Sequence, residues 1–279
     1  MKIQNAQDKK WDRGNIIILK DQSFIERQRI AGKIAAQALS LLKLEVKNNT
    51  SLSLLELDKL AEAFIRDNKC LPTFKGYHGF PNSICSSVNQ NLVHSIPTNY
   101  HLKDGDVISF DLGATFEGAI GDTALTCIYG EAKKKEHIKL IEATKECLNA
   151  AIALVDKTMK NKQEIRVGAI GECIYRTAKN KGFNVYSQYG GHGLEENVPH
   201  APPFVANRSD KNEGVYLRTN MTIAIEPLLI ANTFSTETKV AEDDWTVVGK
   251  DVNAHEEHTL FIHEDRVEIM TAREDENNG

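Results

Sequence analysis

VISFDLGATFEGAIGDTAL, residues 107–125, has the pattern of a strand, a tight turn and a second strand. Each strand carries an aspartate, Asp111 and Asp122, among residues that belong in a hydrophobic core. Aspartate is depleted in strands and is seldom buried without a partner. Two carboxylates at positions where Val, Ile or Phe would pack better therefore indicate a partner for their charge.

The register of this hairpin decides how the two carboxylates face each other. A two-residue turn at Phe116 and Glu117 would place Asp111 directly opposite Asp122. Opposed residues share a face with Cβ atoms about 5 Å apart. Two ionised carboxylates there repel, so one takes up a proton or a cation lies between them. A shared-proton dyad, a metal site and two solvated acids on an exposed hairpin all remain open from the hairpin alone.

Composition and charge exclude several classes of protein. The 279 residues are 41% hydrophobic and 26% charged, as in ordinary soluble globular proteins. The net charge of −5 argues against a general binder of DNA or of anionic membranes. The apolar run at 16–19 is too short for a signal-peptide core or a membrane span.

The five cysteines are odd in number, far apart and without a CxxC pair. This usage predicts free thiols in a reducing compartment, and hence a cytoplasmic protein. The cysteines are Cys70, Cys85, Cys127, Cys147 and Cys173.

Two helical segments precede the hairpin, at 23–42 and 53–68, and two more follow it, at 135–159 and 164–183. The two in the first half each open with a capping box, at Ser23–Glu26 and Ser53–Glu56. Strand-like segments follow each helical pair, so a long helix, a shorter helix and strands with acids occur twice.

This repeated order predicts an α+β fold with pseudo-two-fold symmetry, in which helices cover one face of an antiparallel sheet. No linker rich in Pro, Gly or Ser divides the halves, so residues 1–279 are expected to form a single domain. Within it, residues 1–20 are expected to form an N-terminal arm and residues 273–279 a frayed acidic tail.

The second half adds three candidate ligands for a metal. His192 lies in a glycine-flanked turn, YGGHGL, where the ring can reach inward. Glu226 ends the apolar strand MTIAIEP just before Pro227, where burial alone does not explain a glutamate. Glu257 leads into another apolar strand, although Glu256 and Glu257 also fit a solvated pair.

Together these residues supply four carboxylates and one imidazole. One divalent ion rarely recruits four carboxylates, whereas two ions that share bridging carboxylates do. The donor set suits Mn, Fe, Co or Zn, and the absence of cysteine ligands argues against a structural zinc site. Two such ions would hold a bridging water as a nucleophile near neutral pH.

The segments VHSIP, GDVISFDLGATFEGAIGDTA, YGGHGL, MTIAIEP and EEHT, in this order and spacing, resemble the type I methionine aminopeptidases of the pita-bread metallopeptidase family. The match runs from about residue 20 to residue 272. The resemblance implies a pita-bread fold and metal-dependent removal of the initiator methionine from nascent chains with a small second residue. It also implies a dinuclear site with the ligands Asp111, Asp122, His192, Glu226 and Glu257.

The resemblance also implies a role for each ligand. Asp111 would be bidentate on one ion, and Asp122 and Glu257 would bridge the two. His192 would hold the other ion beside Glu226, and Glu226 would also act as a base.

Substrate contacts follow from the same resemblance. His94, in LVHSIP, matches the histidine that contacts the amide of the scissile bond and assists proton transfer. Phe74 makes the pocket mouth more apolar, because bacterial relatives often carry Cys there. An apolar, aromatic and sulfur-containing pocket suits an unbranched thioether. The residues expected to line it are Tyr77, His78, Phe80, Cys85 and Trp245.

One segment departs from the family pattern. HGLEENVPHAPP has Glu195 in place of a glycine and places His200 eight positions after His192, not seven. A one-residue loop insertion would still deliver His200 to the site, where it would stabilise the oxyanion. We expect Glu195 to lie near the metals and to alter their charge balance or lower turnover.

Two other functions remain as alternatives. Pita-bread peptidases that cleave Xaa-Pro bonds usually carry an additional N-terminal domain that is absent here. Non-catalytic pita-bread proteins that bind peptides, RNA or the ribosome typically lose ligands that this chain keeps. The expected partners are nascent peptides and, transiently, the ribosome, with no DNA and no membrane, and the chain is expected to be a monomer.

Overall fold

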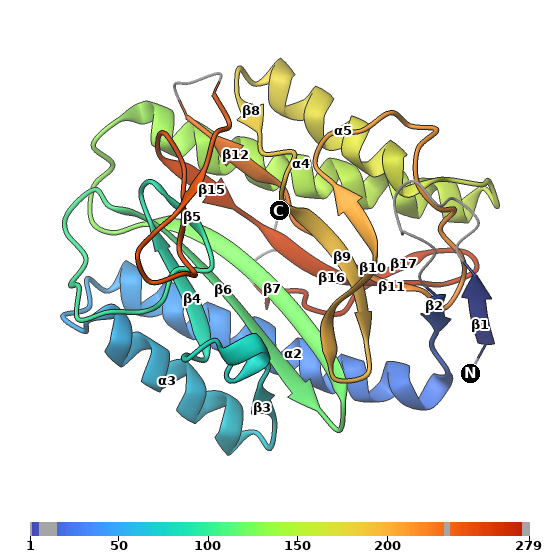
Figure 1. The fold of residues 1–279 in the computed structure, drawn as a ribbon, viewed down its shortest axis with the longest axis horizontal. Helices are drawn as coiled ribbons and strands as arrows, with labels where there is room; N and C mark the ends of the chain where they lie inside the picture. The colour runs from blue at the N-terminus through green and yellow to red at the C-terminus, as the bar shows by residue number, and fades with distance from the viewer. Residues whose placement is uncertain (1, 6–15, 232–234, 275–279) are drawn as a thin grey trace.

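The computed structural model describes residues 2–5, 16–231 and 235–274, and its centre is an antiparallel sheet of nine strands (Figure 1). Two of them lie off the main path: β17 (Val267–Ile269) pairs with β16, and β4 (Ile84–Val88) pairs with β6. Along the main path the order is β10 (Val198–Ala206), β9 (Gly190–Glu195), β11 (Thr222–Ile225), β16 (Glu257–Ile262), β7 (Ala119–Ile128), β6 (Val107–Phe116) and β3 (Leu71–Pro72).

Four helices accompany the sheet as two matched pairs. α2 (Gln22–Lys47) and α4 (Lys135–Lys160) have 26 residues each, and α3 (Leu54–Asp67) and α5 (Val167–Asn180) have 14 each. In Figure 1 the first pair runs along the lower edge and the second along the upper edge, with the sheet between them. The repeated element order expected from the sequence is therefore present.

Alternation along the strands separates a helix-covered face from a second face. Ile108, Phe110, Leu112 and Ala114 of β6 belong to one core cluster with side chains of α2 and α3. Asp111 lies between them in sequence and so points to the other face. In the second half, β11 joins a core cluster with α4 and α5 in the same way.

The helix starts agree only in part with the sequence. Ser53 and Glu56 form the predicted capping box of α3. The capping box predicted at Ser23 is wrong, because the carboxylate of Asp21 accepts the hydrogen bond of the Phe24 backbone N–H at 2.9 Å. With this N-cap the helix begins at residue 22.

The hairpin register also differs from the prediction. The turn residues are Glu117 and Gly118, not Phe116 and Glu117, and both have positive φ, 45° and 82°. A type I′ turn requires positive φ at both positions, and glycine meets this requirement best at the second. Asp122 therefore pairs with Gly113 and not with Asp111. The shift moves the pairing by two residues, so both aspartates still share one face, diagonally placed.

Three smaller sheets complete the fold, together with the 3-10 helix η1 (Tyr77–Gly79). Among the described helices none has the length and apolar character needed to cross a membrane. Residues 275–279 of the expected tail lie outside the described residues, whereas Arg273 is buried. The smaller sheets are β1 (Lys2–Asn5) with β2 (Ile16–Leu19), β15 (Asn253–His255) with β12 (Leu228–Ile230) and β8 (Asn184–Val185), and β13 (Lys239–Val240) with β14 (Val247–Val248) and β5 (Asn91–Val93).

Helix α2 crosses β7 where two glycines meet. A Cβ atom on Gly121 would lie 2.3 Å from the Gly32 Cα, so nothing larger than glycine fits without movement. We expect Gly121→Ala to lower the free energy of unfolding by about 2–3 kcal/mol through overpacking. Urea denaturation measures the change, and Lys33→Ala on the exposed side of α2 is the control, expected within about 0.5 kcal/mol of wild type. Equal stability of the two variants would contradict this contact.

Candidate metal centre

Three adjacent strands place two carboxylates in one row. Asp111 of β6 pairs with Ala124 of β7, and Ala124 pairs on its other side with Glu257 of β16. Paired residues point to the same face, so the small side chain of Ala124 lies between the two acids. The row therefore leaves room above Ala124 for something that both carboxylates can reach.

Asp122 joins the row from two positions along β7. It shares the face of Ala124, and its pairing partner is Gly113, where the missing side chain makes room for Thr73. The Thr259 hydroxyl accepts a hydrogen bond from the Asp122 backbone N–H at 2.9 Å and donates to the Asp122 carbonyl at 2.8 Å. This double contact holds β7 against β16 at the level of the cluster.

His192 and Glu226 enter from the other half of the sheet. The His192 Nε2 atom lies 3.5 Å from an oxygen of Glu226 and 4.0 Å from an oxygen of Glu257. His192 Nδ1 lies 3.1 Å from the Gly193 carbonyl oxygen, which can only accept a hydrogen bond. Nδ1 is thus assigned the proton, which leaves the Nε2 lone pair directed at the carboxylates.

These side chains form overlapping groups whose ligand atoms lie within 4.8 Å of one another. Asp122, His192 and Glu257 each belong to two of the three groups, whereas Asp111, Glu226 and His200 each belong to one. The groups are Asp111 with Asp122 and Glu257, His192 with Glu226 and Glu257, and Asp122 with His192 and His200. The arrangement can hold divalent cations, with Asp122, His192 and Glu257 placed where the groups overlap.

The buried carboxylates have unsatisfied oxygens that cations could bind. One oxygen each of Asp111, Asp122 and Glu257 is buried and has no hydrogen-bond partner among the described residues. Burial raises the pKa of Asp111 to about 7. Burial, with the charge of Asp111, raises the pKa of Asp122 far above its ordinary value, and burial with the charge of Asp122 does the same for Glu257. Divalent cations would satisfy these oxygens, so the residues present fit a metal centre.

Glu226 behaves differently because of His255, a residue that the sequence analysis missed. His255 Nε2 lies 3.3 Å from Glu226 Oε2, and its side chain is buried. Burial alone would raise the pKa of Glu226, but the close contact with His255 and the charge of its ring outweigh it, so this pKa is lowered. His255 lies two positions before Glu257, and this period-2 spacing is the signal that could have revealed it.

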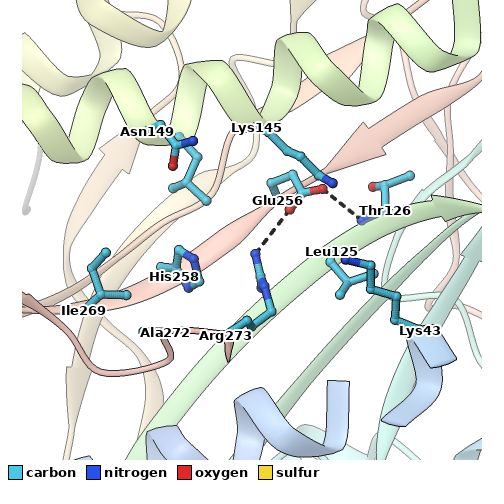
Figure 2. Close-up of a pocket in the computed structure, with 11 residues that line it drawn as sticks. Lys43, Leu125, Thr126, Lys145, Asn149, Glu256, His258, Ile269, Ala272 and Arg273 are labelled. Atoms are coloured by element: carbon cyan, nitrogen blue, oxygen red, sulfur yellow. Dashed lines mark hydrogen bonds and ion pairs between the residues drawn. The ribbon is translucent and has the colours of Figure 1, made fainter. Parts of the chain in front are cut away.

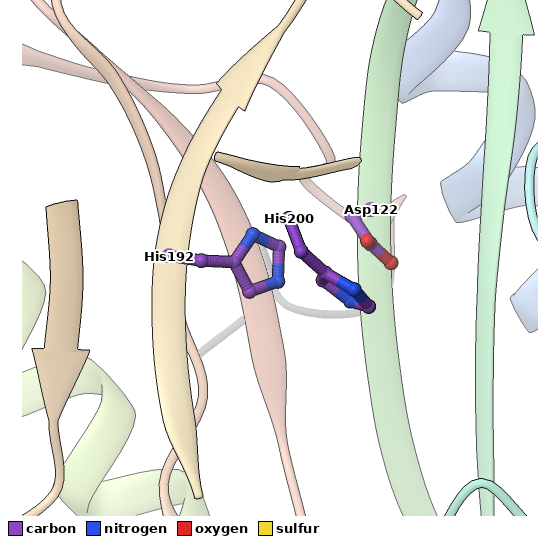
Figure 3. Close-up of side chains that lie close together, drawn as sticks. All are labelled: Asp122, His192 and His200. Carbon is purple, nitrogen blue, oxygen red and sulfur yellow. The ribbon is translucent and has the colours of Figure 1, made fainter. Parts of the chain in front are cut away.

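The extra residue before His200 is absorbed by a bulge. Val198 pairs with Glu195 and Ala201 with Gly193, so the register of β10 against β9 shifts by one between these pairs. His200 reaches the cluster, with its ring centroid 4.6 Å from that of His192, and Figure 3 shows it beside Asp122. His200 is exposed as a whole, but desolvation of the part of its ring that faces the cluster, followed by the charge of His192, lowers its pKa.

Glu195 does not lie where the sequence analysis expected it. It is three positions from His192, so strand alternation directs it to the opposite face of β9. Its carboxylate accepts a hydrogen bond from the Ile18 backbone N–H at 3.4 Å. Its charge also acts on Lys20, whose pKa burial lowers to about 8 and Glu195 partly restores. Glu195 therefore contacts β2 and is not a member of the metal cluster.

A cavity of about 140 Å³ opens beside the cluster. Cys85 pairs with Asp111 between β4 and β6, so one cavity wall adjoins a carboxylate of the row. Phe80 and Trp245 meet edge to face with ring centroids 5.2 Å apart. All seven side chains predicted to contact substrate line this cavity, together with Phe74 and Asp111: Tyr77, His78, Phe80, Cys85, His94, His200 and Trp245.

A second cavity, of about 390 Å³, lies on the helix side of β7 and β16 (Figure 2). Glu256 is fully buried there and lies 3.3 Å from Arg273, so Glu256 and Glu257 do not form a solvated pair. Arg273 also donates to the Thr123 hydroxyl at 3.0 Å and to the Ala124 carbonyl at 3.2 Å. The ion pair supports from behind the strands that carry the ligands.

Comparison with known proteins agrees with this geometry. The model of metallopeptidase family M24 matches residues 26–264, which include every ligand of the cluster. The chain belongs to metallopeptidase family M24.

Within family M24, the relatives are methionine aminopeptidases. That of Mycoplasma capricolum is 40% identical over 261 residues, covering 93% of this chain and 100% of that protein. Methionine aminopeptidase 1 of Bacillus subtilis is 38% identical over 258 residues, covering 92% and 99%. These matches confirm the family resemblance drawn from the motifs.

Solved structures of family M24 confirm the pita-bread fold. The methionine aminopeptidase of Thermotoga maritima superposes with a TM-score of 0.83 at 34% identity, covering 92% of this chain and 100% of that chain. The prolidase of Pyrococcus furiosus shares the fold, with a TM-score of 0.67 at 18% identity, but this chain covers only 66% of it.

Proposed function

We propose that this chain removes the N-terminal methionine from nascent polypeptides whose second residue is small. The observation that carries the proposal is the apolar cavity of about 140 Å³ that shares Asp111 with the carboxylate cluster. A side chain bound in this cavity would place the first peptide bond beside the cluster. Phe74, Phe80, Cys85 and Trp245 suit an unbranched thioether better than a charged or polar group.

We propose that the cluster holds two divalent ions chosen from Mn, Fe, Co and Zn, with Asp122 and Glu257 shared between them. Asp111 would complete one set of ligands, and His192 and Glu226 would complete the other. Such ions would lower the pKa of water and polarise the scissile carbonyl.

Three side chains of the protein would handle protons and charge. Glu226 would act as the base, since its contact with His255 favours the ionised carboxylate. His200 borders both the cavity and the cluster. In this position its ring N–H can donate a hydrogen bond to the oxyanion. His94 lines the same cavity, and burial lowers its pKa, so a neutral ring would meet the scissile amide and assist proton transfer.

The same proposal covers the setting of the reaction. The five free cysteines support a reducing compartment, so we place the enzyme in the cytoplasm. We expect it to act as a monomer and to meet its substrates through transient contact with the ribosome.

One assay tests the function directly. The metal-free protein is reloaded with Mn, Co or Fe and offered Met-Gly-Ser and Met-Leu-Ser, with Ala-Pro-Ser as the Xaa-Pro substrate. We expect metal-dependent release of methionine from Met-Gly-Ser, at least about tenfold slower release from Met-Leu-Ser, and no cleavage of Ala-Pro-Ser.

The outcomes separate the alternatives. Cleavage of Ala-Pro-Ser in preference to Met-Gly-Ser would assign the Xaa-Pro activity instead. No methionine release with any metal, for wild type and Asp111→Ala alike, would end the hydrolase proposal in favour of a binding protein.

A further inference from the structure

The aromatic wall of the 140 Å³ cavity comes from one loop, residues 73–83, which joins β3 to β4. The loop contributes four of the nine residues that line the cavity. Two of them, Phe74 and Phe80, are buried with exposed fractions of 7% and 5%. These four residues are Phe74, Tyr77, His78 and Phe80.

Short-range backbone hydrogen bonds shape this loop from within, such as those from the Gly76 N–H to the Phe80 carbonyl at 2.8 Å and from the Tyr77 N–H to the Phe74 carbonyl at 3.0 Å. Lys75, Gly76, His78 and Gly79 are exposed, and the regular structure within it is the three-residue η1. Three positive φ values within four residues, 88° at Gly76, 48° at His78 and 90° at Gly79, bend the backbone sharply. Phe74 and Phe80 pack against Cys85 and Trp245, whereas the residues at the tip of the loop are exposed, so an anchor at the ends of the loop helps to fix its position.

Helix α3 supplies that anchor with two carboxylates spaced four residues apart, Asp58 and Glu62, which therefore lie on one helix face. Asp58 is buried, and its carboxylate accepts three hydrogen bonds from the end of the loop. The donors are the Ser83 N–H at 2.8 Å, the Ile84 N–H at 3.0 Å and the Asn82 side-chain amide at 2.8 Å.

Glu62 contacts both ends of the loop, Ser83 near its end and Lys75 near its start. Its Oε2 accepts from the Ser83 hydroxyl at 3.0 Å and from the Lys75 ammonium at 2.6 Å, while Oε1 accepts from Arg66 at 2.8 Å. Lys75 directly follows Phe74 in the cavity wall. The two carboxylates thus bind the loop both before and after Tyr77 and His78.

We propose that Asp58 and Glu62 are positioning residues that set the side-chain specificity of the cavity by holding the 73–83 loop against it. The inference rests on the proposed function, since it assigns the determinant of methionine selectivity. Neither carboxylate lines the cavity, so both act through the aromatic rings that the loop carries. Charge-assisted hydrogen bonds are short and strong, so this grip can fix ring positions in an otherwise exposed segment.

The test compares Asp58→Asn, Glu62→Gln and Lys75→Ala with wild type. Asp58→Asn replaces one hydrogen-bond acceptor with an N–H donor that faces the Asn82 amide. Glu62→Gln removes the negative charge that binds Lys75. We expect KM for Met-Gly-Ser to rise about tenfold with kcat within about twofold of wild type. The preference for Met-Gly-Ser over Leu-Gly-Ser should fall by about tenfold, because a loose wall no longer excludes a branched side chain.

A binding measurement keeps this inference separate from the proposed activity. Calorimetric titration with free L-methionine and L-leucine should show the same loss of selectivity in all three variants, while Mn affinity stays at the wild-type value. Asp67→Asn, an exposed carboxylate at the end of the same helix, is the matched control and should behave as wild type.

The outcomes are distinct. Unchanged selectivity in peptide and amino-acid assays, with all variants folded, would overturn the positioning role. Lys75 has an exposed side chain, so Lys75→Ala decides the question if the buried Asp58→Asn variant does not fold. Methionine binding without methionine release would sink the proposed activity alone, and failure of wild type to bind methionine would sink both.

Discussion

Replacement of Asp122 with alanine is expected to lower metal-dependent methionine release by at least about a thousandfold. Asp122 belongs to two of the three groups of possible ligands and is proposed to be shared by both ions, so its loss is expected to weaken both cation positions at once. Isothermal calorimetry with Mn should show fewer than two ions bound per chain. Kinetics of the reloaded enzyme on Met-Gly-Ser measure the loss of activity.

A stability measurement distinguishes loss of a ligand from loss of the fold. In the metal-free protein, Asp122 lies in a buried carboxyl cluster where like charges oppose ionisation. Asp122→Ala should therefore unfold at the same temperature as metal-free wild type or higher, yet gain little from added Mn. The exposed Asp265→Ala is the control and should keep full activity and stoichiometry. Two ions bound with undiminished affinity in Asp122→Ala would contradict a shared ligand at this position.

The metal-free protein is expected to become less stable as the pH rises from about 6.5 to 8. The pKa values of Asp122 and Glu257 are raised well above their ordinary values by burial and by neighbouring charge, so these groups keep their protons in the folded state. The unfolded chain has released the same protons above about pH 5. The folded state then binds more protons than the unfolded state, so stability falls with rising pH.

The pH window is chosen so that histidines do not oppose this trend. Desolvation lowers the pKa values of His94 and His200 in the folded state. In the unfolded chain these histidines take up protons only below about pH 6.5, so above that pH they do not change the trend. Urea denaturation with a chelator present measures the effect at each pH. Excess Mn should reverse the slope, because cations replace the protons, and Asp122→Ala should make the metal-free slope shallower. A flat or rising stability curve in the chelated wild type would contradict the raised pKa values.

The face on which each ligand lies could be predicted from the sequence, but the pairing of the ligands could not. Alternation along 107–125 places Asp111 and Asp122 on one face for any hairpin turn of two residues, so a turn shifted by one residue left this conclusion intact. The exact pairing, Asp122 with Gly113, depends on positive φ at Glu117 and Gly118. The sequence allowed a turn at 116–117 or at 117–118, and the backbone geometry of residues 117 and 118 selects the second.

Contacts between distant segments escaped the sequence analysis for a related reason. His255 meets Glu226 because β15 pairs with β12, where His255 lies opposite Leu228, and Arg273 meets Glu256 because β17, which precedes Arg273, pairs with β16. Glu195 was expected near the metals because it is close to His192 in sequence, but strand alternation turns it toward β2. Proximity along the chain does not decide which face of a sheet a side chain joins.

The sequence by itself determined the repeated order of a long helix, a short helix and strands, the five ligand types and the strands that carry them. These properties are local, since they depend on hydrophobic period, capping and the chemistry of each side chain. Only the tertiary structure decided which carboxylates lie together, that the small Ala124 lies between Asp111 and Glu257, and that Asp58 and Glu62 hold the aromatic loop. These contacts join residues far apart in the chain, and sheet order and helix packing set their distances.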